Sequence, residues 1–321
     1  MLTPALEAVD LAHAYPGPRG AVEALRAVTL TVPRGEFFGL FGPNGAGKTT
    51  FIRVLATLVI PTSGHARVLG LDVVRDAARV RAQIGLVFSN ENALYGRLTG
   101  RQNLEFFAAL QGLAPGAARR RSAELLDFLG LTSAADRPAQ AYSTGMRQKL
   151  NVARALLHDP AIIFLDEPTK GLDALTAETL RHLLRRELAE RRGKTVLLTT
   201  HDLGEMEQLC DRVAVLEAGR LRAVGAPADL VREASRSVIY RLEVAGSGPG
   251  LADRLAQLPG VRAVTLAADG AATVLDLTLA RAPEADLWRL LADLGVRVLR
   301  FGPKEDGLVT VLKELSQAGH E

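Results

Sequence analysis

Short runs of apolar residues alternate with helix-like patterns along about the first 235 residues of the chain. Continuous apolar runs of about five residues are typical of strands buried on both faces of a parallel sheet. Strands that alternate with helices are typical of an α/β domain. The predicted strands are Phe37–Phe41, Ala161–Leu165, Val196–Thr199 and Val213–Leu216. Residues 1–235 are therefore predicted to form an α/β domain with a mostly parallel sheet.

The pattern between Asn103 and Leu157 is mainly helical. Pro115-Gly116 interrupts it once, and Arg137-Pro138 interrupts it again. Proline ends a helix because it has no backbone N–H and its ring clashes with the preceding turn. We therefore predict a helical subdomain, about residues 91–158, inserted into the α/β domain.

A second, smaller α+β domain is predicted over residues 236–321. Its elements are predicted in the order β-α-β-β-α-β, which is the order of the ferredoxin-like arrangement. The predicted strands are Val238–Val244, Val261–Ala267, Thr273–Leu279 and Val296–Phe301, and the predicted helices are Leu251–Leu258 and Glu284–Leu294. A last helix is predicted over about residues 307–317.

Composition and charge restrict the possible functions. The net charge of +3 argues against a nucleic-acid-binding protein, which normally concentrates a large basic excess. The single cysteine, Cys210, rules out an intrachain disulfide and fits a reducing cytoplasm. No apolar run approaches the roughly 18 residues of a transmembrane helix. We therefore expect a soluble chain, for which any membrane role requires a separate partner chain.

The strongest chemical signal is a glycine-rich loop that follows a predicted strand and opens a predicted helix. It fits the G-x-x-x-x-G-K-[ST] phosphate-loop pattern in the required context. Its backbone N–H groups and the helix N-terminus can bind phosphate oxygens. Lys48 can reach the β- and γ-phosphates of ATP, and the Thr49 hydroxyl can bind Mg²⁺. The loop consists of Gly42, Pro43, Asn44, Gly45, Ala46, Gly47, Lys48, Thr49 and Thr50.

The second signal is a pair of adjacent carboxylates, Asp166 and Glu167, at the end of an apolar run. Burying two carboxylates without partners is costly, so a cation or substrate is expected beside them. We predict that Asp166 holds Mg²⁺ and that Glu167 is the general base that polarises the attacking water.

The third signal is the segment Ser143-Thr144-Gly145-Met146-Arg147-Gln148, which precedes an amphipathic helical pattern. Ser143 is a favourable N-cap for that helix. A serine, a glycine and a helix N-terminus can also form an anion site. From spacing alone, an ordinary capped helix is the preferred interpretation.

These three motifs, in this order, resemble the ATP-binding cassette of ABC transporters, and the resemblance extends from about Leu6 to Val231. Ser143–Gln148 resembles the family signature, here called the signature segment. The resemblance implies that Tyr15 stacks on adenine and that His201 contacts the γ-phosphate. It also implies that Gly171-Leu172-Asp173 is the D-loop, which links two copies of the cassette.

One position departs from the family pattern. The family places a glutamine after an Ile-Gly-hydrophobic-Val run, whereas Ile84–Phe88 is followed here by Ser89-Asn90-Glu91-Asn92. Asn90 keeps the amide group on a shorter side chain. We therefore predict Asn90 as the ligand of ATP and Mg²⁺ at this position, with Ser89 as the alternative.

The resemblance further implies a homodimer in which two copies enclose two ATP molecules, each signature segment facing the partner's nucleotide. Separate integral-membrane permease subunits would hold the chain at the cytoplasmic face of the membrane. Leu94–Leu104, the signature segment and the small C-terminal domain resemble the drug-resistance branch of bacterial exporters. The helical block after Asn90 is the predicted docking surface, with apolar contacts from Tyr95, Leu98, Phe106 and Phe107, although the two phenylalanines fit core packing equally well.

Two other classes of function remain as alternatives. A non-transport ABC ATPase with a regulatory role, in translation or DNA repair, usually has two cassettes or a long coiled coil, and neither pattern is present. A P-loop kinase or a binding module that does not hydrolyse ATP is disfavoured by the signature segment and by Glu167.

Overall fold

The computed structural model describes residues 3–18, 20–88, 94–191, 193–230, 238–245, 250–268, 272–279 and 285–303. It divides the chain into two compact units, 1–227 and 228–321. The predicted boundary between residues 235 and 236 falls outside the described residues, as does the predicted helix at about 307–317.

A six-stranded sheet in the first unit has the strand order β10-β9-β3-β8-β7-β6. Its strands β9, β3, β8, β7 and β6 run parallel, and β10 pairs antiparallel with β9 at the edge. Each apolar run predicted to be a strand forms one of the parallel strands. The bounds are β3 (Phe37–Phe41), β6 (Ile84–Phe88), β7 (Ile162–Asp166), β8 (Thr195–Thr200), β9 (Arg212–Glu217) and β10 (Arg220–Gly225).

A second, antiparallel sheet has the strand order β2-β1-β4-β5 and was not predicted from the sequence. Leu6, Ala8 and Leu11 of β1 are buried. The spacing of these apolar residues among polar ones is the sequence pattern that could have predicted the strand. The strands are β1 (Leu6–Tyr15), β2 (Val22–Val32), β4 (Ser63–Val68) and β5 (Leu71–Asp72).

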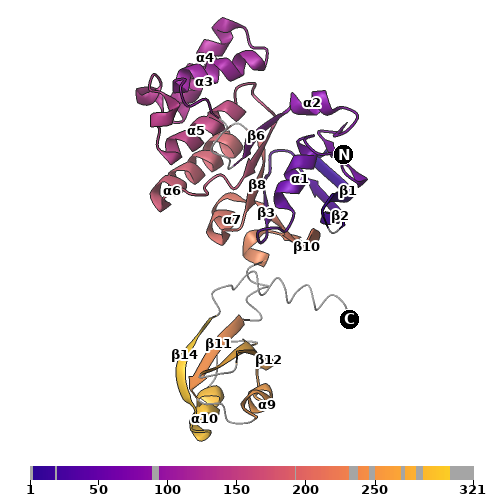
Figure 1. Ribbon diagram of the computed structural model, residues 1–321, viewed down its shortest axis with the longest axis vertical. Helices are drawn as coiled ribbons and strands as arrows, with labels where there is room; N and C mark the ends of the chain where they lie inside the picture. The colour runs from indigo at the N-terminus through magenta and orange to yellow at the C-terminus, as the bar shows by residue number, and fades with distance from the viewer. Residues whose placement is uncertain are drawn as a thin grey trace. The chain divides into compact units, whose positions relative to one another are not determined.

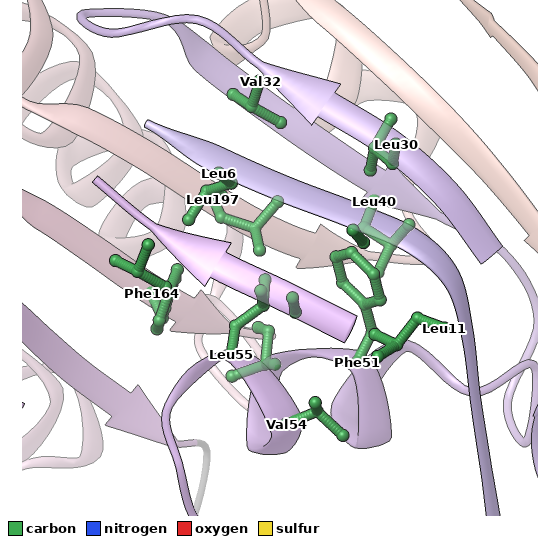
Figure 2. Close-up of a cluster of buried hydrophobic side chains, with 14 of the residues drawn as sticks. Leu6, Leu11, Leu30, Val32, Leu40, Phe51, Val54, Leu55, Phe164 and Leu197 are labelled. Atoms are coloured by element: carbon green, nitrogen blue, oxygen red, sulfur yellow. The ribbon is translucent and has the colours of Figure 1, made fainter. Parts of the chain in front are cut away.

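Helix α1 (Lys48–Leu55) packs between the two sheets and fills the core of this unit (Figure 2). Its side chains Phe51, Val54 and Leu55 are at most 1% exposed. They belong to one cluster with Leu40, Phe164 and Leu197 of the six-stranded sheet and with Leu6, Leu11, Leu30 and Val32 of the antiparallel sheet. Because α1 is buried on both sides, the loop that precedes it is held rigidly against the sheet.

The chain between β6 and β7 is helical, as its pattern predicts, and α3 and α4 pack together at one end of the unit (Figure 1). Thr99 caps α3 with a complete capping box. The helices of this stretch are α3 (Gly100–Leu110), α4 (Pro115–Phe128) and α5 (Thr144–Ala155), with short 3-10 turns at Thr132–Ala134 and Ala139–Ala141. The other helices of the unit are α2 (Ala77–Arg81), α6 (Ala174–Leu183), which continues as a π-helical segment over Leu184–Arg191, and α7 (Leu203–Leu209).

The described part of the second unit contains a four-stranded antiparallel sheet in the order β12-β13-β11-β14, together with the helices α9 and α10. The elements follow one another as β-α-β-β-α-β: β11 (Val238–Ala245), α9 (Leu251–Ala256), β12 (Val261–Ala268), β13 (Ala272–Leu279), α10 (Ala285–Asp293) and β14 (Arg297–Pro303). This unit has its own apolar core, built from strand and helix leucines such as Leu242, Leu255, Leu275 and Leu291. The core contains no residue of the predicted nucleotide site.

Candidate active site

The phosphate loop joins the carboxyl end of β3 to the first turn of α1, as the sequence predicts. Gly47 is the N-cap of α1 with φ 104°, a conformation that favours glycine. A Cβ atom there would also collide with the carbonyl oxygen of Ala24 in β2. Asn44 and Gly45 form the exposed tip of the loop, while Gly42, Ala46, Lys48 and Thr50 are buried and Pro43, Gly47 and Thr49 are partly buried.

Lys48 lies in the loop with its ammonium group donating to the carbonyl oxygens of Gly42, at 2.6 Å, and Pro43, at 3.0 Å. Only 5% of the residue is exposed. Burial lowers the pKa of Lys48, and the nearby carboxylates of Glu167 and Asp166 partly offset this effect. The loop therefore holds a positive charge among its own backbone groups, as a phosphate-binding site requires.

Asp166 lies at the carboxyl end of β7 and is 5% exposed. The Thr49 hydroxyl donates to its carboxylate at 3.0 Å to Oδ2 and 3.2 Å to Oδ1. The Thr199 hydroxyl donates to Oδ1 at 2.5 Å. The three side chains meet because β3, β8 and β7 are parallel neighbours whose carboxyl ends lie at one edge of the sheet, where such sheets bind ligands.

The donor set at Asp166 fits Mg²⁺. Hydroxyl and carboxylate oxygens are the ligands that this hard cation prefers. The described residues contain no group of three or more His, Cys, Asp or Glu side chains that could hold a metal by themselves. Mg²⁺ is usually held by one or two carboxylates together with water and substrate phosphates. Thr49 and Asp166 therefore suit a metal ion that arrives with a nucleotide.

Glu167 directly follows β7, and its backbone has φ 49°, in the left-handed region that non-glycine residues seldom occupy. Its backbone N–H donates to the carbonyl oxygen of Thr199, at 3.1 Å, and to the Thr199 hydroxyl, at 3.2 Å. Backbone strain of this kind occurs most often at functional sites. Because of this turn, the side chains of Asp166 and Glu167 point in different directions. Asp166 contacts Thr49 and Thr199, whereas Glu167 contacts other residues.

Both carboxylate oxygens of Glu167 have a basic partner. Oε1 lies 3.1 Å from Nδ1 of His201, and Oε2 lies 2.8 Å from Nζ of Lys170. Burial raises the pKa of Glu167, but the hydrogen bonds from Lys170 and His201 outweigh burial and hold this pKa below its ordinary value. Glu167 is therefore ionised at neutral pH, as a general base must be.

Three residues of this site were not predicted from the sequence: Lys170, Thr199 and Glu205. Glu205 of α7 is 2% exposed and accepts a hydrogen bond from the Thr169 hydroxyl at 2.9 Å. Burial raises the pKa of Glu205. Thr199 ends a predicted strand beside His201, which is a signal that could have found it, whereas no sequence pattern distinguishes Lys170 from a surface lysine.

The signature segment opens helix α5, and Ser143 is its N-cap. The Ser143 hydroxyl is exposed and accepts a hydrogen bond from the N–H of Met146 at 3.2 Å. Gly145 is buried against α6, where a Cβ atom would collide with the side chain of Thr176. The side chain of Asp173, the N-cap of α6, accepts hydrogen bonds from Thr176. Thr176 therefore links the signature segment to Asp173, the last residue of the predicted D-loop, within one chain.

Tyr15, a predicted nucleotide ligand, does not contact this cluster in the described residues. Tyr15 ends β1 and packs edge-on against His13, with ring centroids 4.5 Å apart. Its hydroxyl is buried and has no hydrogen-bond partner within the described part of the chain. Asn90 and its alternative Ser89 lie outside the described residues, so their role in binding stays a prediction.

Comparisons with known proteins identify the family to which this chain belongs. Residues 25–170 match the family model described as "ABC transporter". The chain is 41% identical over 311 residues to the daunorubicin resistance ATP-binding protein DrrA2 of Streptomyces coeruleorubidus, covering 94% of this chain and 92% of that one. It is 35% identical over 263 residues to the linearmycin resistance ATP-binding protein LnrL of Bacillus subtilis (strain 168), covering 81% and 82% of the two chains.

A solved structure shares the cassette fold. It is the dimeric post-hydrolysis state of the ATP-binding cassette MJ0796 bound to ADP and Pi, with a TM-score of 0.63 and 28% identity. The match covers 69% of this chain and 98% of that one. The chain therefore belongs to the ABC transporter ATP-binding proteins, close to the drug-resistance ATPases, and is the ATP-hydrolysing subunit that powers a membrane permease.

Proposed function

We propose that this ATPase drives export through integral-membrane permease subunits and works as a homodimer with two shared ATP sites. The catalytic part of the proposal depends on one cluster of side chains at the carboxyl ends of β3, β7 and β8. Asp166 accepts hydrogen bonds from Thr49 and Thr199, and Glu167 contacts His201. Lys48 lies close enough to both carboxylates for its pKa to be affected by them. The names of the resistance proteins DrrA2 and LnrL support export. The dimeric cassette structure supports the homodimer.

Each residue has a distinct role in the proposed hydrolysis. Lys48 and the phosphate-loop N–H groups bind the phosphates. Thr49 and Asp166 would hold Mg²⁺, which would supply positive charge beside the phosphoryl oxygens. Glu167 accepts a proton from the water that attacks the γ-phosphate, and His201 orients the Glu167 carboxylate through Oε1. Phosphoryl transfer to water needs mainly such positioning and charge stabilisation. Tyr15 and Asn90 are proposed to complete the nucleotide site.

We place the permease at a groove beside the helical block. This groove has a volume of about 280 Å³. Its apolar wall includes Leu58, which is 54% exposed, and Phe107, which packs with Tyr95 and Phe106 in one aromatic cluster. Exposed aromatic and aliphatic side chains around a concave surface are typical of a protein interface. No described helix is long and apolar enough to cross a bilayer, so the proposed location at the cytoplasmic face depends on this contact.

Substituting an apolar residue of the groove should test this placement. Leu58→Asp is expected to weaken binding to the permease at least tenfold, since a charge would have to be desolvated at the interface. ATP hydrolysis by the isolated chain should be unchanged. Ile60→Asp is the matched control, because Ile60 is 70% exposed and is not among the residues lining the groove. Equal loss of binding by both variants, or by neither, in co-purification with the permease would contradict this docking site.

We further propose that the second unit is a ferredoxin-like accessory domain that stabilises the dimer or regulates it. The element order β-α-β-β-α-β and the antiparallel sheet support this assignment. A chain that ends near Arg236 should bind ATP with unchanged affinity, because every described residue of the nucleotide site lies in the first unit. The truncated chain should dimerise several-fold more weakly, as measured by sedimentation. Loss of ATP binding in a folded truncated chain would show that the second unit belongs to the nucleotide site.

A further inference from the structure

Lys170 is held beside Glu167 by a tight turn. The backbone N–H of Lys170 donates to the carbonyl oxygen of Glu167 at 3.2 Å, which closes a four-residue turn with Pro168 in its second position. Proline favours that position because its φ angle is already fixed. The hydrogen bond from Thr169 to the buried Glu205 ties the turn to α7. The backbone of Lys170 is therefore positioned independently of its side chain.

The Lys170 ammonium engages the one oxygen of Glu167 that His201 leaves free. Nζ lies 2.8 Å from Oε2, while His201 lies 3.1 Å from Oε1. The Glu167 side chain is 12% exposed, whereas the Lys170 side chain is 58% exposed. The carboxylate is thus enclosed, but the lysine that holds it can rotate into solvent without a change in the backbone turn. Among the described residues, Lys48 on α1 and Asp166 on β7 are further charged groups near this pair.

We propose that Lys170 is a positioning residue that restrains the general base: its ammonium holds Oε2 of Glu167, and its departure frees that oxygen to accept the proton of the attacking water. The inference rests on the proposed role of Glu167. The ammonium of Lys170 contacts the Glu167 carboxylate, so Lys170 acts through Glu167. A general base needs a free carboxylate lone pair within hydrogen-bond distance of the attacking water. The Lys170 ammonium, 2.8 Å from Oε2, competes with that water for a lone pair of Glu167.

Removing the ammonium should therefore raise the rate of hydrolysis. With the full chain, Lys170→Met is expected to raise kcat about two- to fivefold, the size of effect that exposed ion pairs have. KM for ATP should stay unchanged, because the ammonium of Lys170 pairs with Glu167 and not with a residue of the phosphate loop. Lys170→Arg keeps a cation on a stem of similar length and should retain the wild-type kcat. Lys170→Ala is a second variant without the ammonium and should change kcat in the same direction.

A control separates this effect from the general loss of an ion pair. Lys194 pairs with Asp159 at 2.9 Å, away from Glu167, whose basic partners are Lys170 and His201, so Lys194→Met should leave kcat unchanged. A purely structural role for Lys170 would lower the thermal unfolding temperature without raising kcat. An unchanged or lower kcat in Lys170→Met, or a raised KM, would overturn the proposal. Glu167→Gln assayed in parallel separates the two hypotheses: if it hydrolyses ATP normally, the role of Glu167 as base fails, whatever Lys170 does.

Discussion

Replacement of Glu167 by glutamine is expected to lower ATP turnover by about 10²–10⁴-fold, the contribution typical of a general base. Glutamine has the same shape and can adopt the same strained backbone, with φ 49°. Its amide cannot accept a proton from water. ATP binding should survive, because the hydrogen bonds from Lys48 to Gly42 and from Thr49 to Asp166 do not involve Glu167. A closed, ATP-bound dimer should accumulate, since hydrolysis would no longer reopen it.

This prediction can be checked by measuring phosphate release, ATP binding and dimer formation by size-exclusion chromatography. Glu217→Gln is a suitable control, because Glu217 also ends a parallel strand of the same sheet and is paired with an arginine, Arg222, at 3.2 Å. The control variant should hydrolyse ATP at close to the wild-type rate. If Glu167→Gln also turns over ATP at close to the wild-type rate, then Glu167 is not the base.

The second prediction with a large expected effect is that each ATP site is formed by residues of two chains. Ser143 is exposed at the N-terminus of α5, and Gly145 packs on α6 rather than on the phosphate loop. A two-fold dimer would place each signature segment against the partner's γ-phosphate, and two-fold symmetry is the commonest in soluble oligomers. Hydrogen bonds from the Ser143 hydroxyl and nearby N–H groups to a charged phosphate contribute about 1.5–3 kcal/mol each.

Two heterodimers with the same lesions in different arrangements distinguish shared sites from separate ones. In the first, one chain carries Lys48→Ala and its partner carries Ser143→Glu, which places a negative charge against the phosphate. If sites are shared, both lesions fall in one composite site and the other site is intact. In the second, one chain carries both lesions opposite a wild-type partner, and both composite sites are damaged.

The first heterodimer is therefore expected to be roughly tenfold or more active than the second, because one lost charged hydrogen bond corresponds to about that factor in affinity. ATPase rate and ATP-driven closure are the measurements, on heterodimers purified with two different tags. If each chain completed its own site, the order of activities would reverse. A ratio at or below one, with heterodimer formation confirmed, would contradict shared sites.

The parts of the site that are local along the chain could be predicted from the sequence. The phosphate loop could be predicted because strand, glycine-rich turn and helix follow one another within a few residues, and both the glycines and Lys48 act through that turn. The pair Asp166 and Glu167 could be predicted because it ends an apolar strand. The element order of the second unit was equally predictable, because each element has its own hydrophobic pattern.

Which distant residues contact these local motifs depends on how the strands and helices pack. The contact of Asp166 with Thr199 depends on the register of β7 and β8, which pairs these two residues across the sheet. The link from Thr169 to Glu205 depends on where α7 packs. The pairing of Lys170 with Glu167 depends on a strained backbone turn, and the sequence of that turn does not specify where its side chains point.

The antiparallel sheet and the groove beside the helical block also depend on contacts between distant parts of the sequence, which could not be predicted from local patterns. Strand β1 pairs with β2 and β4, which are separated from it by different lengths of chain, and this pairing buries α1 between two sheets. The groove combines side chains as far apart in sequence as Leu58 and His158. Hydrophobic periodicity predicts which face of a helix or strand is buried. It does not predict which other element packs against that face, because the hydrophobic effect is non-directional.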